Sequence, residues 1–246
     1  MPNVYLYGFI DTLESPKVRQ FRTRGLGGAP ATVIDEDGVG ALVGSVSHVP
    51  VPVQPDLLLA HENVLERALG LSTVLPAAFG TVAGTRAEIR GLLRRHREVL
   101  RQEFERLRGL CEFGLKVYWR REIVRRELSI VSETEAELGA NDLADPDYVK
   151  GRAIRVGQEV EALILYWRRR YEDAVFAGLR ARASDMRLGD PIGPRMMWNA
   201  SFLIARSDTA SFEDLVERTK TRFGDRFTFR MMGPLPPYNF VSLHLR

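Results

Sequence analysis

The sequence predicts an α+β protein of two domains, and two observations carry that prediction. Strand-like segments rich in β-branched and aromatic residues alternate with amphipathic helical segments along the 246 residues. After residue 110 the order is strand, long helix, strand, helix, strand, with one weak extra strand, as in a βαββαβ unit. We therefore expect an N-terminal mixed α/β domain over residues 1–110. We also expect a ferredoxin-like C-terminal domain over residues 111–246 that includes the C-terminal tail.

The first domain begins with segments typical of a sheet. Val4–Ile10 is β-branched and aromatic, and 31–34 and 39–46 form two further strand candidates around the turn at 35–38. The glycine-rich stretch before residue 31 is expected to be a loop. Asp56 can cap a helix that ends at Gly70.

A long helix follows a short strand. Val74–Val82 carries Pro76 and Gly80 inside an apolar run, which predicts a short or bulged strand near an edge. From Thr85, apolar residues recur at steps of three and four, which predicts one continuous helix. Its apolar face comprises Ile89, Leu92, Leu93, His96, Val99, Leu100, Phe104, Leu107 and Leu110.

The second domain is predicted from residue 111 onward. Phe113–Trp119 is a strand candidate, and 120–142 is expected to hold a short helix and a loop. Asp145, Pro146 and Asp147 form a helix opening, with a cap, a proline in the first turn and an acid. The helix is expected to reach about residue 183 with the seam of a coiled coil or helical hairpin. That seam comprises Val149, Ala153, Val156, Val160, Leu163 and Trp167.

Three more strands and a helix complete the second domain. A weak strand is expected near 186–192, and stronger ones at Trp198–Ala205 and Arg226–Met232. Ser211 and Asp214 match a capping box, so Ser211 is predicted to cap the intervening helix.

Composition excludes several classes of protein. The chain is 45% hydrophobic and 27% charged, which is ordinary for a globular protein and excludes a mainly disordered chain. The single cysteine, Cys111, excludes an intrachain disulfide and fits a reducing cytosol. The opening residues lack the pattern of a signal peptide, and there is no apolar run long enough to span a bilayer. We expect a cytoplasmic protein.

No catalytic, cofactor-binding or metal-binding constellation is apparent. The histidines, His48, His61, His96 and His244, do not have the spacing of a helical metal pair. His96 is expected to be a packed or hydrogen-bonded core residue. The Gly25–Gly28 loop lacks the lysine and hydroxyl residue of a P-loop. We predict that the protein is not an enzyme and uses no cofactor.

The arginines leave two interpretations open. The chain has 31 arginines and four lysines, and its net charge is only +3. Eight arginines lie between residues 86 and 108, and further groups lie at 120–126 and 168–170. This helix face could bind nucleic acid as part of a regulatory α+β protein. Because glutamates are interleaved and no aromatic stacking motif is present, an ion-paired protein surface is the favoured interpretation, without nucleic acid or membrane as partner.

The C-terminal segment is the candidate interaction site. Three prolines make Gly233–Tyr238 rigid because they fix φ and remove backbone donors. The continuation through Phe240 to Leu243 has the composition of a strand that docks. The segment is either a structural latch or a partner-binding surface, and its candidate residues are Pro234, Leu235, Pro236, Pro237, Tyr238 and Phe240.

Five segments in order resemble the gas vesicle protein F/L family (GvpF/GvpL), and they span nearly the whole chain. They are Tyr5–Ile10, His61–Glu66, Val74–Val82, Glu112–Tyr118 and Gly233–Val241. Two positions depart from the family's usual pattern: Ala78 stands in place of an arginine, and Leu235 stands in place of a tryptophan.

The resemblance implies a non-enzymatic accessory or minor structural protein of gas vesicle assembly. It implies two α+β domains, the second a modified ferredoxin-like fold with a long coiled-coil-like helix. The implied partners are the small hydrophobic gas vesicle shell protein and other gas vesicle accessory proteins. A shell subunit with an apolar face toward gas is prone to aggregate before assembly, so an accessory protein could shield that face.

Overall fold

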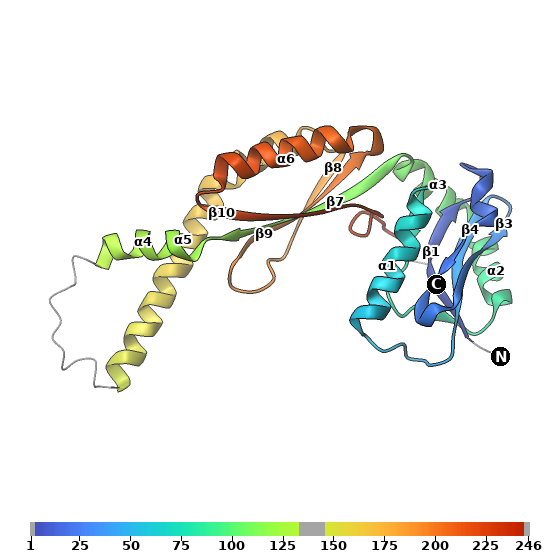
Figure 1. Ribbon diagram of the computed structural model, residues 1–246, viewed down its shortest axis with the longest axis horizontal. Coiled ribbons are helices and arrows are strands. Elements are labelled where there is room, and N and C mark those ends of the chain that lie inside the picture. The colour runs from blue at the N-terminus through green and yellow to red at the C-terminus, as the bar shows by residue number, and fades with distance from the viewer. Residues whose placement is uncertain (1–2, 133–145, 244–246) are drawn as a thin grey trace. The chain divides into compact units, whose positions relative to one another are not determined.

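The protein is an α+β protein with two β-sheets, seen in a computed structural model that describes residues 3–132 and 146–243 (Figure 1). The described chain divides into two compact units. The first unit comprises residues up to 113 together with 203–207 and the segment from 233 onward. The second comprises 114–202 and 208–232. The α+β class predicted from the sequence is confirmed.

The sheet of the first unit has six strands in the order β2-β3-β4-β1-β5, with β6 also paired to β1. Each strand pairs antiparallel with its neighbour. The strands are β1 (Asn3–Asp11), β2 (Arg22–Arg24), β3 (Pro30–Glu36), β4 (Val39–Val46), β5 (Val74–Pro76) and β6 (Val82–Ala83). The expected loop before residue 31 therefore contains a short edge strand, β2. The expected interrupted strand over Val74–Val82 is the pair β5 and β6.

Strand β1 lies at the centre of this sheet, and its irregularity has a local cause. The register with β4 shifts between Leu6 and Gly8, so Tyr7 is the extra residue of a bulge. A Cβ at Gly25 would lie 2.0 Å from the Tyr7 hydroxyl oxygen, so the glycine makes room for that ring. The tight β3–β4 turn places Asp37 and Gly38 at φ 51° and 92°, a geometry suited to Asp-Gly.

Three helices belong to the first unit: α1 (Pro55–Leu69), α2 (Arg86–Arg95) and α3 (Arg97–Leu107). Helix α1 ends at Gly70 as expected, but Gln54 occupies its N-cap position and Asp56 lies in the first turn, so the cap prediction was wrong. Thr85 caps α2 by accepting a 3.1 Å hydrogen bond from the Glu88 N–H.

The single helix predicted from Thr85 is two helices. The backbone leaves helical geometry at His96, with φ −108° and ψ 14°, and α3 begins at Arg97. His96 is half-buried at this junction, and Val99, which was predicted on the apolar face, is 45% exposed. The break could not be predicted from the spacing of apolar residues, because that spacing continues in phase from α2 into α3.

The core of the first unit lies between the sheet and helices α2 and α3. Leu6, Phe9 and Val43 from the sheet pack against Leu93 and Phe104 from the helices. The other members of this cluster are Val4, Ile34, Val39, Ala41, Leu75, Ile89, Leu100, Leu107, Leu203 and Phe240.

The second sheet has the strand order β10-β7-β9-β8. Its strands are β7 (Leu110–Trp119), β8 (Asp185–Gly189), β9 (Met196–Ala205) and β10 (Phe227–Leu235). The helices between them are α4 (Arg121–Ser132), α5 (Pro146–Arg180) and α6 (Thr209–Phe223). The chain order through these elements is β7, α4, α5, β8, β9, α6, β10.

An aromatic cluster forms the core of the second unit. Trp198 lies 5.5 Å from Phe176 and 5.6 Å from Phe227, centroid to centroid, with edge-to-face geometry. Phe202 packs 5.3 Å from Phe212 of α6. Trp167 of α5 contacts Phe227 at 5.9 Å. The edge-to-face contacts of Trp167 and Trp198 add to the stabilisation from burial of a large apolar area.

One expectation for the second unit and one for the C-terminal tail need correction, and a third stays a prediction. Ser211 does not cap α6: Asp208 occupies the N-cap position, and the Ser211 hydroxyl donates to the Asp208 carbonyl. Phe240–Leu243 is turn and irregular chain, not a strand, because Pro236 and Pro237 interrupt pairing after Leu235. Along the expected coiled-coil seam of α5, Trp167 is buried but Val156 is 44% exposed. Val149 and Ala153 lie among the side chains that the structure does not describe.

Candidate functional site

The C-terminal segment, residues 233–243, lies against the first unit and is only partly exposed. Pro234 is exposed and Leu235 is half-buried, whereas Pro236 and Pro237 are buried. Tyr238 is 37% exposed, and Phe240 is fully buried in the core of the first unit. The structure therefore separates the predicted site residues into a buried subset and an exposed subset.

Hydrogen bonds anchor this segment at two points. The Asn239 backbone N–H donates to Glu112 Oε2 at 2.8 Å, and the Asn239 side-chain amide donates to Oε1 at 2.5 Å. Arg106 Nη2 donates to the Phe240 carbonyl at 2.6 Å. Glu112 is 2% exposed, so these bonds from Asn239 replace water for a buried carboxylate.

Gly233 permits the close approach of the segment to β7. Its φ is 142°, and a Cβ there would lie 2.6 Å from Phe113 Cδ1 and 2.9 Å from the Glu112 carbonyl oxygen. A side chain at this position would therefore clash with the strand that carries Glu112.

A cluster of four rings lies beneath helix α1 in the first unit. Tyr5 contacts Tyr7, His61 and Phe79 at centroid distances of 4.8, 5.7 and 6.2 Å. His61 also lies 5.6 Å from Tyr7 and 5.8 Å from Phe79. The cluster thus joins β1, α1 and the loop after β5.

The polar atoms of this cluster form a short chain of hydrogen bonds. The Gly80 N–H donates to the Tyr5 hydroxyl at 3.1 Å, and that hydroxyl lies 2.9 Å from His61 Nδ1. Burial raises the pKa of Tyr5 to about 12, so the phenol keeps its proton near pH 7. Burial lowers the pKa of His61 to about 4, with an opposing effect of the Ala77 carbonyl, so the imidazole is neutral near pH 7.

Tyr238 connects the aromatic cluster with an acidic surface. Burial raises the pKa of Tyr238, and the negative charges of Glu62, Glu66 and Glu112 raise it further. Tyr5 also raises the pKa of the Tyr238 hydroxyl, by a smaller amount. One residue at the end of the chain is therefore close to side chains from β1, α1 and β7. We call Tyr238, Glu62, Glu66 and Glu112 the Tyr238 patch.

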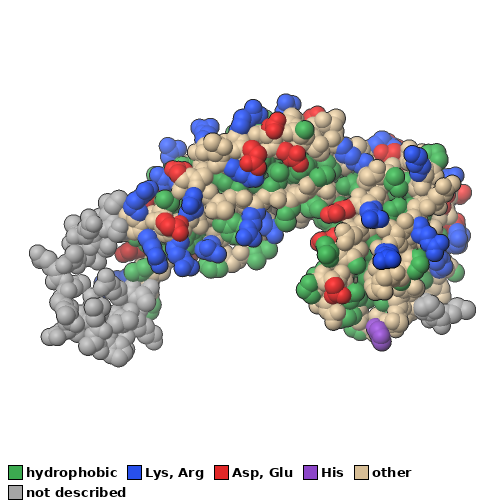
Figure 2. Space-filling view, viewed as in Figure 1, with side chains coloured by type: hydrophobic (Ala, Val, Ile, Leu, Met, Phe, Trp, Pro, Cys, Tyr) green, Lys and Arg blue, Asp and Glu red, His purple; other side chains and the backbone are tan. Residues whose placement is uncertain are grey.

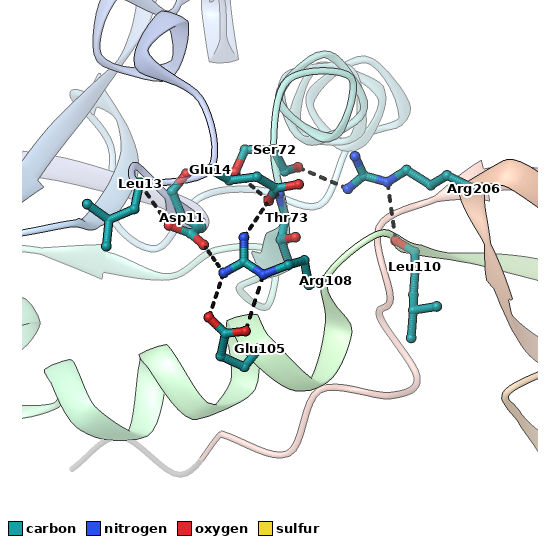
Figure 3. A network of polar contacts seen from close by, with 9 residues as sticks. All are labelled: Asp11, Leu13, Glu14, Ser72, Thr73, Glu105, Arg108, Leu110 and Arg206. Carbon is teal, nitrogen blue, oxygen red and sulfur yellow. Dashed lines mark hydrogen bonds and ion pairs between the residues drawn. The ribbon is translucent and has the colours of Figure 1, made fainter.

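A second polar network closes the opposite end of β1 (Figure 3). Arg108 Nη2 binds Asp11 Oδ2 at 2.9 Å and Glu105 Oε1 at 2.7 Å, and these contacts raise the pKa of the guanidinium. Burial alone would raise the pKa of Glu14, but hydrogen bonds from Thr73 and Ser72 lower it below its ordinary value. The network ties β1 to α3 and to the start of β5.

Arg206 extends this network. Its Nη2 donates to the Ser72 carbonyl at 3.1 Å, and its Nε donates to the Leu110 carbonyl at 3.4 Å (Figure 3). Because Arg206 contacts Ser72 and Arg108 contacts Asp11, both distant in sequence, no local pattern could have identified these two contacts.

The arginine-rich helices α2 and α3 carry mostly paired guanidinium groups. Arg90 and Arg94 both bind Glu36, at 2.6 and 3.4 Å, and Arg97 binds Asp37 at 3.0 Å. Figure 2 shows basic and acidic side chains interspersed over the visible face. This arrangement is that of an ion-paired surface and offers no continuous basic stripe on that face.

The described residues offer no group of three or more His, Cys, Asp or Glu placed to hold a metal ion. His48 is exposed, and His244 lies outside the described residues. Gly25 of the glycine-rich loop contacts Tyr7. Within 3–132 and 146–243, no helix is long and apolar enough to cross a membrane.

Comparison with known proteins identifies the family. The model of the family described as gas vesicle synthesis protein GvpL/GvpF matches residues 3–242. The chain belongs to this family. Gas vesicle protein F from Microcystis aeruginosa is 27% identical to it over 98% of both chains. Gas vesicle protein F from Dolichospermum flosaquae is 29% identical over 76% of this chain and 77% of that protein.

Two crystal structures of the family are similar to the whole fold. The GvpF structure from Anabaena sp. PCC7120 has a TM-score of 0.79 and 25% identity, and covers 99% of this chain and 98% of its own. The GvpF structure from Microcystis aeruginosa has a TM-score of 0.77 and 26% identity, with 99% and 100% covered. The resemblance predicted from five sequence segments is confirmed, and the chain is a gas vesicle protein.

Residues from all five of those segments meet in the first unit. Tyr5, His61, Phe79, Glu112 and Tyr238 come from the five segments in turn, and they lie in the aromatic cluster or the Tyr238 patch. Sequence analysis singled out Tyr238 but missed Glu112 as its neighbour and as the partner of Asn239. The local signal was an acidic residue between apolar neighbours in a strand that also carries Lys116.

Proposed function

We propose that this gas vesicle protein is a non-enzymatic assembly factor or minor structural component that acts in the cytoplasm and at the gas vesicle. Its proposed partners are the small hydrophobic shell protein and other gas vesicle accessory proteins. The observation that carries the proposal is the meeting of the five family segments around the aromatic cluster and the Tyr238 patch. Such a surface suits protein recognition, because it combines the partly exposed ring of Tyr238 with the exposed carboxylates of Glu62 and Glu66.

We propose that the C-terminal segment is a latch with an exposed recognition edge. The buried Phe240 and the Asn239–Glu112 bonds support the latch role. A partner contact is supported by the exposure of Pro234 and by the partial exposure of Leu235 and Tyr238. Pro236 and Pro237 are buried between the two and would hold the exposed residues in a fixed conformation.

Helix α5 is the proposed contact for the apolar shell protein. Its apolar side chains Ile154, Leu165 and Tyr166 are 55%, 45% and 59% exposed. Large exposed apolar side chains are characteristic of protein interaction surfaces. An apolar shell subunit would bury them together with its own apolar surface, which stabilises the complex by roughly 25 cal/mol per Å² of buried area.

We further propose that the second unit is a modified ferredoxin-like domain and that the domain boundary lies near residue 110. The chain order β7, α4, α5, β8, β9, α6, β10 and the strand order β10-β7-β9-β8 support the first point. The segment from residue 233 onward is part of the first compact unit, so the chain returns to that unit after the proposed second domain. Limited proteolysis that releases a stable fragment ending near residue 110 would support the boundary.

Co-expression and co-purification test the function. The tagged protein is expressed with the shell protein and the other gas vesicle proteins, and the captured partners are identified. We expect the shell protein to co-purify with the unaltered chain and to be lost with Tyr166→Glu. The matched control is Ile192→Glu, which places the same charge at another exposed apolar residue of the second unit.

Three outcomes of this experiment would contradict parts of the proposal. If neither the shell protein nor any other gas vesicle protein co-purifies, the assembly role is wrong. If the shell protein is retained by Tyr166→Glu, or lost with both variants equally, the assignment of α5 is wrong. Binding of labelled RNA or DNA that weakens steeply with salt would instead favour a nucleic-acid-binding function.

A further inference from the structure

A pocket on the first unit is lined by three arginines that form no ion pair within the part of the chain that the structure describes. Its volume is about 680 Å³, and Arg22, Arg24 and Arg67 contribute its three charged side chains. The remaining lining includes Thr23 and Asn63 and has no aspartate or glutamate. The pocket differs chemically from the Tyr238 patch: its charged residues are arginines, whereas those of the patch are glutamates.

Two secondary-structure elements present these side chains. Arg22 and Arg24 are alternate residues of β2 and are both exposed, while Asn63 and Arg67 lie one turn apart on α1. Arg67 Nη1 donates to the Thr23 hydroxyl at 3.2 Å, which joins the helix to the strand. The three arginines of the pocket are therefore carried by regular secondary structure, β2 and α1.

These arginines differ from those on α2 and α3. Arg90, Arg94 and Arg97 each have a carboxylate within 3.4 Å. Among the described residues no carboxylate forms an ion pair with Arg22, Arg24 or Arg67. An anionic ligand in the pocket would supply the missing counter-charge and accept paired hydrogen bonds from the guanidinium groups.

The geometry points to an extended peptide as the source of the anion. Strand β2 is the terminal strand of its sheet and pairs only with β3 among the described strands. Alternate residues of an extended chain lie on one side, roughly 6.6 Å apart, in both β2 and a peptide beside it. No aromatic side chain lines the pocket, so the stacking that single-stranded nucleic acids use is absent from it.

We propose that this arginine pocket binds an extended acidic peptide whose carboxylates occupy alternate positions. Arg22 and Arg24 would each pair with one carboxylate, and Arg67 would donate to the peptide from the side of α1. Peptide binding at a sheet edge supplies affinity through the backbone and specificity through alternate side chains. The pocket is thus a recognition site for a protein partner, independent of the contact proposed for α5.

The probe is a synthetic peptide with the sequence of residues 131–140 of this chain, Val-Ser-Glu-Thr-Glu-Ala-Glu-Leu-Gly-Ala. It carries glutamates at alternate positions, 133, 135 and 137, and no basic residue. A control peptide of the same composition has the three glutamates contiguous. Fluorescence anisotropy with the full-length protein measures both, at low and at physiological salt.

We expect the alternating peptide to bind and the contiguous one to bind at least tenfold more weakly. Arg24→Gln and Arg67→Gln should each weaken binding about tenfold, because each removes one charge-assisted pair. The matched control is Arg95→Gln, an exposed arginine of α2 outside the pocket, which loses the same charge and should leave binding unchanged. Unchanged melting temperatures show that the variants fold.

Three results would overturn the proposal. The first is no peptide binding at low salt, and the second is equal loss with Arg24→Gln and Arg95→Gln. The third is a single-stranded oligonucleotide that binds more tightly than the peptide with the same sensitivity to Arg24→Gln, which would make the pocket a phosphate site.

Discussion

Phe240 near the end of the chain and Tyr166 in the middle of α5 are both large aromatic residues, yet Phe240 is fully buried and Tyr166 is 59% exposed. From its sequence, the C-terminal segment is either a structural latch or a partner-binding surface, and in the structure its Phe240 is docked in the core of the first unit. The sequence of helix α5 predicts the apolar seam of a coiled coil or helical hairpin, and the helix exposes several apolar side chains. Composition alone did not reveal which aromatic side chain is buried; the packing of each segment decided which one stabilises the fold.

The largest effect is expected from removing the buried ring. Phe240→Ala should lower the free energy of unfolding by about 3–5 kcal/mol, because it removes buried area and leaves a cavity. Tyr166→Ala, its matched control on α5, should change the same quantity by no more than about 0.5 kcal/mol. Chemical denaturation measures both. Equal effects of the two variants would show that the C-terminal segment is not a latch.

The next effect concerns the polar anchor of the same segment. Asn239→Ala should cost about 1.5–3 kcal/mol, because it removes the side-chain amide that donates to Oε1 of the buried Glu112 carboxylate and leaves only the backbone N–H at residue 239 as a donor from this segment. The double variant Glu112→Gln with Asn239→Ala should lose less than the sum of the two single changes, since a neutral amide is cheaper to bury. Additive costs in this double-mutant cycle would contradict the coupling.

A third test extends the comparison to a buried titrating group. His61 has a pKa of about 4 in the folded protein against an ordinary value of 6.5, so between these values the unfolded chain binds more protons. Stability should therefore fall as the pH is lowered from 6.5 to 4, by at most about 1.4 kcal/mol per pH unit from this residue.

The control for that test is His61→Asn, whose side-chain oxygen can accept from the Tyr5 hydroxyl but does not titrate. Urea melts across this pH range should show a shallower dependence for the variant than for the unaltered protein. Parallel pH profiles would mean that His61 is not buried as a neutral group.

The smallest effect is expected at the ion-paired surface. Arg97→Ala breaks a 3.0 Å pair with Asp37 whose two side chains are 39% and 74% exposed. The loss of stability should be no more than about 0.5 kcal/mol at low salt and should disappear at high salt, because exposed pairs are screened. A loss comparable to that of Asn239→Ala would show that the exposed arginine pairs are structural.

Much of the fold was predictable because its signals are local. The bulky strand Val4–Ile10, the turn at Asp37–Gly38 and the stop at Gly70 were read from neighbouring residues, and the structure agrees. The cap of α6 and the break at His96 were not predicted, because a cap depends on which of several polar residues meets the helix end, and a break leaves the hydrophobic period unchanged.

The candidate site was predictable only in part. The rigid proline segment and Tyr238 could be singled out because prolines have a fixed effect on the backbone. The pairing of Glu112 with Asn239 spans 127 residues, and the arginine pocket combines β2 with α1 from across a long loop. Neither has a local pattern from which it could be inferred.

The sequence by itself determined the α+β class, most strands and helices, and membership of the gas vesicle protein F/L family. These follow from short-range periodicity, turn chemistry and ordered motifs, all of which are properties of neighbouring residues. Only the tertiary structure decided that Phe240 is buried, that Tyr166 is exposed, and that Arg22, Arg24 and Arg67 share a pocket without a carboxylate. Burial and charge pairing depend on residues far apart in the chain, so they are fixed only when those residues pack together.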